Sequence, residues 1–205
     1  MPALPLQTDA FVLLKRPASD KFQGFTVFSA EHGLALVLQR TSKNASATAP
    51  VLDLFDEVAL ALESSNQGQT WFVKEARLLH RPTEIGRSYE ALRLASALAS
   101  LVARNPAPEE SRAGIAQLLR QAFAAFAAGT RPDVVWLKSL YRFARDEGYP
   151  VREDWFAKLP PGDRDGVAGV LNRPLTEQTA KLPAVARLTQ RLEDYLRLHT
   201  EILLE

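Results

Sequence analysis

The sequence of 205 residues contains no cysteine. This absence excludes disulfide bonds, iron–sulfur clusters, thiolate zinc sites and cysteine nucleophiles, and it fits a protein of a reducing cytoplasm. The opening residues MPALPLQ carry no basic segment followed by an apolar core, so we expect no signal peptide. No run approaches the ~20 apolar residues that a membrane span needs. We therefore expect a cytoplasmic protein with no membrane partner.

The sequence also lacks an excess of charge of either sign, and it has few histidines. The 25 Lys and Arg against 24 Asp and Glu give a net charge of +1, so a nucleic-acid site would have to be a local patch. His32, His80 and His199 lie far apart and have no metal-ligand spacing around them. No P-loop, dinucleotide-binding fingerprint or nucleophile elbow occurs. We expect no catalytic residue, no metal and no cofactor. A small-molecule hydrolase, the alternative, would need a deep pocket with convergent polar groups.

From Thr8 to His80, apolar and polar residues alternate with the period of a β-strand. Residues 51–62 fit a helix or a strand by pattern alone; we favour a strand because the turn signal at 64–68 leads directly into another strand. Five antiparallel strands of this size suit a small closed or nearly closed barrel. The other expected strands cover 8–15, 22–28, 34–39 and 70–77.

After Pro82 the apolar period becomes that of a helix. Ser88 is expected to cap the first helix, and the helix over 133–147 is apolar on most sides, which is typical of a buried central helix. The sequence GDRDG at 162–166 weakly resembles an ion-binding loop, but we favour a helix start capped by Asp163 or Asp165. The expected helices cover 88–104, 109–128, 133–147, 153–159, 164–171 and 183–203.

These patterns predict an α+β protein with two domains. Residues 1–82 are expected to form a five-stranded β-barrel, and residues 83–205 an α-helical bundle domain.

The stretch from Gly33 to Pro50 begins as a strand and continues as a loop with two cations and little to bury. It is either a connector without a role or a loop for an anionic partner. Residues 10–48 carry five cations and two anions, although residues 1–82 are neutral overall with eight of each. A cationic edge on a small barrel contacts phosphates through counterion release. The candidate nucleic-acid-binding residues are Lys15, Arg16, Lys21, Arg40, Lys43 and Lys74.

Four aromatic residues of the expected strands could offer faces on which unpaired bases stack. Aromatic residues at a period of two also suit a hydrophobic core, so both interpretations stay open. The four residues are Phe11, Phe22, Phe25 and Trp71.

A second set of cations lies on the expected central helix. Lys138, Arg142 and Arg145 are spaced i, i+4 and i+7, which places them on one face. Beside the apolar residues of that helix, they are candidates for binding an acidic, partly apolar peptide tail of a partner. Alternatively, they solvate the helix and favour its C-terminal dipole end.

The order of several short segments along the chain is similar to that in a known protein family. They are TDAFVLLKR at 8–16, FTVFSAEHGL at 25–34, APVLDLFDE at 49–57, YEALRLASAL at 89–98 and WLKSLYRFARDEGYP at 136–150. In this order the chain resembles the RecO family of recombinational DNA repair proteins over nearly its whole length.

The resemblance implies an oligonucleotide/oligosaccharide-binding (OB) barrel followed by a helical domain, and a non-enzymatic role. It implies binding of single- and double-stranded DNA, annealing of strands, and recombinase loading with RecR and the acidic tail of single-strand-binding protein. Residues 40–44 occupy the place of the family's basic loop, with two cations where three or more are usual. Residues 151–159 stand where many relatives carry a four-cysteine zinc module, so no such zinc is expected. The alternative is a protein-interaction module of the same fold, which docks an acidic tail and has little DNA affinity.

Overall fold

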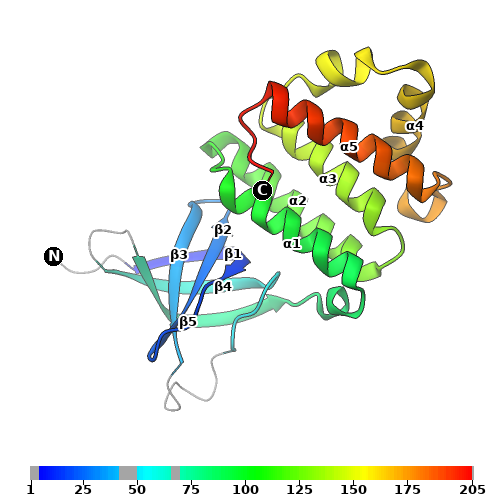
Figure 1. The fold of residues 1–205 in the computed structure, drawn as a ribbon. Coiled ribbons are helices and arrows are strands. Elements are labelled where there is room, and N and C mark those ends of the chain that lie inside the picture. Colours follow the sequence, from blue (N-terminus) through cyan, green and yellow to red (C-terminus); the bar gives the residue numbers. More distant parts are fainter. Residues whose placement is uncertain (1–4, 42–49, 66–69, 205) are drawn as a thin grey trace. The chain divides into compact units, whose positions relative to one another are not determined.

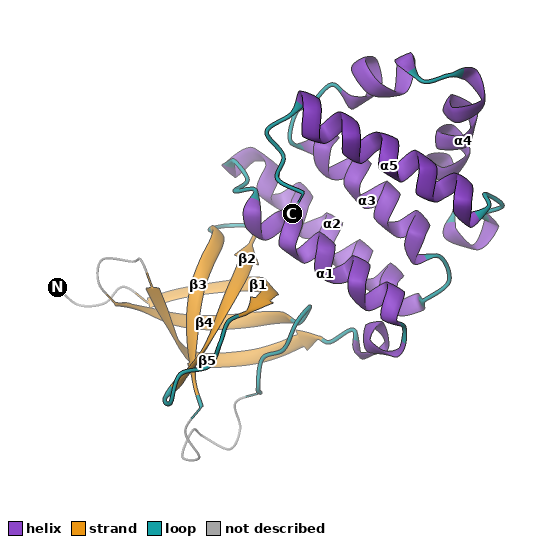
Figure 2. Cartoon of the chain, in the orientation of Figure 1, coloured by secondary structure: helices purple, strands orange, loops and turns teal. Residues whose placement is uncertain are grey.

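A computed structural model describes residues 5–41, 50–65 and 70–204. It is an α+β structure, with an N-terminal five-stranded sheet that closes in a ring and helices after it (Figures 1 and 2). Contacts divide the chain into two compact units, which we call the sheet unit and the helical unit. The predicted domain boundary after Pro82 stays a prediction. The sheet unit is Met1–Pro82 with Val102–Ala116, and the helical unit is Thr83–Leu101 with Gln117–Glu205.

The five strands follow one another around the ring in the order β1-β2-β3-β5-β4. Neighbouring strands are antiparallel except for β3 and β5, which are parallel. We expected antiparallel strands throughout; this one pair differs because β3 lies beside β5 rather than beside β4, its successor in the chain. The strands are β1 Pro5–Lys15, β2 Phe22–Ser29, β3 Gly33–Arg40, β4 Glu57–Ser65 and β5 Thr70–His80.

The inside of the ring holds the hydrophobic core of the sheet unit. Because side chains alternate between the two faces of a strand, every second residue points inward. Phe25 and Val27 of β2 and Val37 of β3 are fully buried there, and Trp71 of β5 packs against them partly buried. Each large apolar side chain that is fully buried contributes about 1.5–3 kcal/mol. The residues between them therefore face outward.

The turn between β2 and β3 depends on Gly33. Its φ of +70° lies in the left-handed region, which glycine adopts without the strain that a Cβ causes. A Cβ at this position would also lie 3.1 Å from Nε of Arg112, and Arg112 donates from Nη1 to the carbonyl of Glu31 at 3.2 Å. The turn signal at this glycine is therefore confirmed, for conformational and packing reasons.

The strand that we expected over 51–62 is correct only in its second part. Strand β4 begins at Glu57, and the residues before it form a turn in which Phe55 has φ +68°. The backbone N–H of Asp53 donates to Oδ2 of Asp56 at 2.8 Å, so a side chain replaces the strand partner. Leu52 is buried in the core, which explains why the pattern resembles a strand.

The helices begin and end close to the predicted residues. The Ser88 cap is confirmed, because the N–H of Ala91 donates to its Oγ at 3.3 Å. Helix α3 is buried on most sides, as expected. The segment expected as a helix over 153–159 is a π-helical turn followed by a 3₁₀ turn. No helix in the described part of the chain is long and apolar enough to cross a membrane. The helices are α1 Tyr89–Arg104, α2 Glu109–Ala128, α3 Pro132–Asp146, α4 Pro161–Asn172 and α5 Leu182–His199.

The cap predicted for the helix near residue 163 is wrong. Helix α4 starts after Pro160 with no side-chain cap, and Asp163 lies in its first turn. This carboxylate is buried and pairs with Arg187 at 2.6 Å and Arg191 at 3.1 Å, both on α5. Two guanidinium groups satisfy it better than backbone amides would, so it joins two helices instead of starting one.

Candidate nucleic-acid interface

Arg16 follows the last residue of β1 and lies against the outer surface of β2. Its backbone N–H donates to the carbonyl of Gly24 at 2.9 Å, and its Nε donates to Oγ1 of Thr26 at 3.3 Å. Gly24 has no side chain, and a Cβ there would lie 3.4 Å from Cβ of Arg16. The missing side chain therefore leaves the space that Arg16 crosses.

Arg40 lies on the same outer surface, at the end of β3. It is the cross-strand partner of Phe22, so both side chains leave the sheet on one side. Its guanidinium carbon lies 5.9 Å from the centre of the Phe22 ring, at cation–π distance. The backbone N–H of Thr41 donates to the carbonyl of Lys21 at 3.0 Å. This bond brings Lys21 beside the same end of β3.

A second aromatic ring reaches this surface from β5. The parallel pairing of β3 and β5 sets Leu38 opposite Phe72, and the same outward register sets Leu38 opposite Gly24 of β2. The ring centres of Phe22 and Phe72 are 5.3 Å apart, with the planes tilted by 52°. All three apolar side chains are partly exposed. We call this surface the Phe22 face, which consists of Arg16, Phe22, Leu38, Arg40 and Phe72.

Of the four aromatic residues considered for base stacking, only Phe22 lies on this face. Phe11 and Phe25 are buried, so the stacking role considered for them is wrong and the core interpretation is correct. Trp71 packs against the core from the inside of the ring. Phe72, which sequence reasoning missed, takes the second outward position. Only the pairing of β3 with β5 brings it there, and no local pattern indicates that pairing.

The remaining cations of the predicted set form ion pairs or lie outside the described residues. Lys15 pairs with Asp53 at 3.7 Å, and Lys74 pairs with Glu63 on β4. Both pairs are well exposed to solvent, where such contacts contribute about 0–1 kcal/mol and exchange readily for another anion. Lys43 lies outside the described residues.

Arg16, Lys21 and Arg40 differ from these two lysines. Among the described residues, no carboxylate forms an ion pair with any of the three. Their side chains are exposed at the ends of β1 and β3 and before β2. The cations without a carboxylate partner among the described residues therefore form a small patch, with two arginines and one lysine beside two aromatic rings.

A buried ion pair, also missed from the sequence, holds the turn before β4. Asp56 is fully buried, and its carboxylate accepts from Nε of Arg81 at 2.7 Å and from Nη2 at 2.5 Å. Nη2 of Arg81 also donates to the carbonyl of Val51 at 2.8 Å, and the bonds to Asp56 raise the pKa of Arg81. This arginine is occupied within the chain, so we do not count it as part of the candidate interface.

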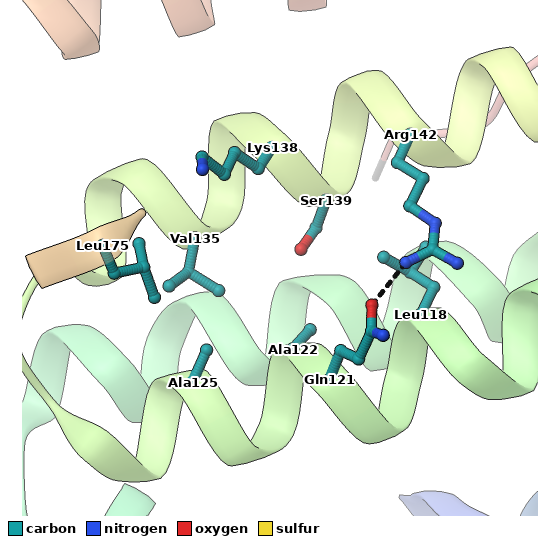
Figure 3. Close-up of a pocket in the computed structure, with 9 residues that line it drawn as sticks. All are labelled: Leu118, Gln121, Ala122, Ala125, Val135, Lys138, Ser139, Arg142 and Leu175. Carbon is teal, nitrogen blue, oxygen red and sulfur yellow. Dashed lines mark hydrogen bonds between the residues drawn. The ribbon is translucent and has the colours of Figure 1, made fainter. Parts of the chain in front are cut away.

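The predicted stripe on α3 borders a groove of about 210 Å³ in the helical unit. Figure 3 shows Arg142 reaching from α3 toward Gln121 of α2, while Lys138 lies along α3. Burial lowers the pKa of Lys138, whose Nζ donates to the carbonyl of Arg173 at 2.6 Å. The floor of the groove is mostly apolar. Its lining residues are Leu118, Gln121, Ala122, Ala125, Val135, Lys138, Ser139, Arg142 and Leu175.

The arginines of this stripe are occupied within the helical unit. Arg142 donates to Oε1 of Gln121 at 2.5 Å and to Oδ2 of Asp146 at 3.2 Å. Arg145 donates twice to Oδ1 of Asp146, at 2.8 and 2.6 Å, and it does not line the groove. The stripe is therefore divided, with Lys138 and Arg142 at the groove and Arg145 away from it.

A larger hollow of about 540 Å³ lies elsewhere in the helical unit, between α1, α3 and α5. Its charged groups bind one another: Glu90 accepts from Arg93 at 2.7 and 3.0 Å, and Asp133 accepts from Arg131 at 2.8 and 2.9 Å. Such bidentate pairs are charge-assisted hydrogen bonds with a fixed geometry. They form a structural network along the wall of the hollow.

No family model matches the chain, and no curated protein matches its sequence. Among the described residues the two guanidinium groups of the Phe22 face have no carboxylate partner, and such groups suit phosphates, as partly exposed aromatic rings suit bases. Polyanionic strands with accessible bases are the ligands that this combination suits.

Proposed function

We propose that this chain is a RecO-like recombination mediator that binds DNA through the Phe22 face of an OB-type barrel. In this role it binds single- and double-stranded DNA, anneals complementary strands and assists recombinase loading. Its protein partners are a RecR-like protein and the acidic tail of a single-strand-binding protein. It performs no catalysis and needs no cofactor.

The arrangement of the sheet supports this proposal. A five-stranded closed sheet in the order β1-β2-β3-β5-β4 is consistent with the OB-fold, whose β2–β3 surface binds oligonucleotides. Arg16, Phe22 and Arg40 belong to or adjoin this surface.

The observation that carries the proposal is the pair of arginines on the Phe22 face. Arg16 and Arg40 leave the sheet on the same side, and among the described residues neither forms an ion pair. A patch of this kind lets a protein of net charge +1 bind a polyanion, because counterion release depends on local contacts and not on total charge.

The experiment is a titration of a fluorescent single strand at several salt concentrations. We expect affinity to fall steeply with salt, and the double variant Arg16→Glu, Arg40→Glu to reduce the logarithmic slope by at least about 1.4, or about 0.7 per phosphate contact. Arg77→Glu is the control, because it makes one such charge reversal, half the charge change of the double variant, on an exposed residue of β5 outside the Phe22 face. It should leave the slope close to that of the wild type.

Two results would contradict the proposal. One is a wild-type slope near zero. The other is a loss of slope in the Arg77→Glu control of about half that in the double variant or more, which would show a response to net charge without a localised site.

A second candidate function is docking of an acidic, partly apolar peptide in the α2–α3 groove. The observation that favours it is the apolar floor of the groove beside Lys138, a partly buried cation that lines it. Lys138→Glu and Arg142→Glu should each weaken binding of an acidic tail peptide at least tenfold. The control Lys181→Glu, an exposed position before α5, should leave binding unchanged. Peptide binding without salt-dependent DNA binding would favour the interaction module over the mediator.

A further inference from the structure

The two rings of the Phe22 face differ in what covers them. Phe22 has the guanidinium of Arg40 over its ring and Phe72 against it. Phe72 has, among the ring and cation contacts of the described residues, only Phe22. Phe72 is partly exposed and has no cation over its ring among the described residues, so it is the ring more available to a ligand, and Phe22 packs against it.

A partly exposed aromatic ring at this position is unusual for a sheet surface. The solvent side of an antiparallel sheet normally carries polar side chains in alternation with the core. Here the outward positions of β2, β3 and β5 instead carry Phe22, Leu38 and Phe72, which are all partly exposed. Arg16 and Arg40 lie beside this group. Apolar surface of this kind is consistent with a ligand that has flat apolar groups next to negative charges.

We infer that Phe72 stacks on unpaired bases, with Phe22 as its positioning residue, so that the Phe22 face distinguishes single-stranded from double-stranded nucleic acid. This inference rests on the proposed function. In a duplex both faces of each base are covered by its neighbours, so Phe72 reaches a base only where the strand is unpaired. Arg16 and Arg40 bind phosphates of either form. The cations therefore produce the salt dependence, and Phe72 produces the discrimination.

The test compares an oligo-dT strand with an abasic strand of the same length. Both have the same phosphates, so their affinity ratio isolates the bases. We expect the wild type to bind the dT strand about tenfold more tightly, as stacking on one ring provides. Phe72→Leu should bring the ratio close to one while leaving the salt slope and the duplex affinity unchanged. Phe72→Trp should keep the ratio, because it keeps an aromatic face.

Two further variants are measured: Phe22→Leu tests the positioning role, and Tyr89→Leu is a control. Phe22→Leu should lower the ratio only in part, since it removes the support of Phe72 and not the stacking ring. Tyr89 is an exposed aromatic residue of the helical unit, and its removal should change nothing. Thermal unfolding of each variant checks the fold. The wild-type ratio is informative by itself, even if Phe72→Leu does not fold.

The results separate this inference from the proposed function. Equal binding of dT and abasic strands by the wild type, with a steep salt slope, overturns the stacking role and leaves the DNA-binding proposal intact. A ratio that survives in Phe72→Leu also overturns it. Absence of salt-dependent binding to either strand overturns both.

Discussion

The Phe22 face and the helical unit use arginine in different ways. On the Phe22 face, Arg16 contacts a hydroxyl group and Arg40 lies over a ring, and neither meets a carboxylate among the described residues. On α3, Arg142 contacts Gln121 and Asp146 within its own unit. An arginine that is satisfied from within the chain stabilises the fold, whereas one that is not can bind an external anion.

Other arginines of the helical unit also bind carboxylates of their own unit. Arg187 and Arg191 share the buried carboxylate of Asp163, and Arg93 binds Glu90 bidentately. Formal charge alone would therefore place a nucleic-acid site on the helices as readily as on the sheet. Only the contacts of each cation distinguish the two units.

Replacing Asp163 by Ala should have the largest effect on stability. The change leaves Arg187 and Arg191 without their shared partner and separates α4 from α5, which should cost about 2 kcal/mol of unfolding free energy. Arg16→Ala and Arg40→Ala should each cost less than about 0.5 kcal/mol, as exposed side chains do. Urea denaturation measures both. Asp165→Ala, at an exposed position of α4, is the control for losing an acidic residue from this helix. Equal costs in the two units would contradict the comparison.

The sequence predicts best those features whose signals are local. The end of α2 at Ala128 is correct because Gly129 follows it, and the start of α1 is correct because Ser88 caps it. The strand error at 51–56 has a local cause as well, since buried Leu52 and Phe55 imitate a strand in a turn held by Asp56.

The candidate interface could be predicted only in part. Arg16, Phe22 and Arg40 lie at the ends of consecutive strands, so a simple meander brings them together. Leu38 and Phe72 meet only through the parallel pairing of β3 with β5, which no pattern of neighbouring residues encodes. Nor does composition indicate which cations have partners, because partners such as Asp56 for Arg81 and Asp163 for Arg187 come from other elements.

Asp146→Asn should make the arginines of α3 more similar to those of the Phe22 face, because it removes their carboxylate partner. It weakens the internal contacts of Arg142 and Arg145, so Arg142 becomes more available at the α2–α3 groove. We expect the affinity for an acidic tail peptide to rise about threefold, which is below 1 kcal/mol and typical of an exposed pair. Fluorescence anisotropy of a labelled peptide measures it. Asp154→Asn, which releases Lys158 at an exposed site away from the groove, is the control. No increase in Asp146→Asn would show that the internal pair does not compete with the peptide.

The smallest effect concerns the pH dependence of the Glu90–Arg93 pair. Its hydrogen bonds lower the pKa of Glu90 below the ordinary value of 4.5. A lowered pKa in the folded state means that the pair stabilises the protein fully above the unfolded pKa, and that this contribution is lost as the pH falls through the folded pKa. Both side chains are about half exposed, so we expect a difference between wild type and Glu90→Gln of at most about 0.5 kcal/mol at pH 7, shrinking toward zero below pH 4.

Urea midpoints of wild type and Glu90→Gln between pH 7 and pH 3 measure this difference. Glu110→Gln, in the first turn of α2, is the control for removing an acidic charge near a helix start, where the dipole favours it. A gap for Glu90→Gln that stays constant down to pH 3, or one that follows the Glu110→Gln gap, would mean that Arg93 does not hold the carboxylate. Arg93 would then be as available to an external anion as the arginines of the Phe22 face, and the contrast between the two units would fail at that position.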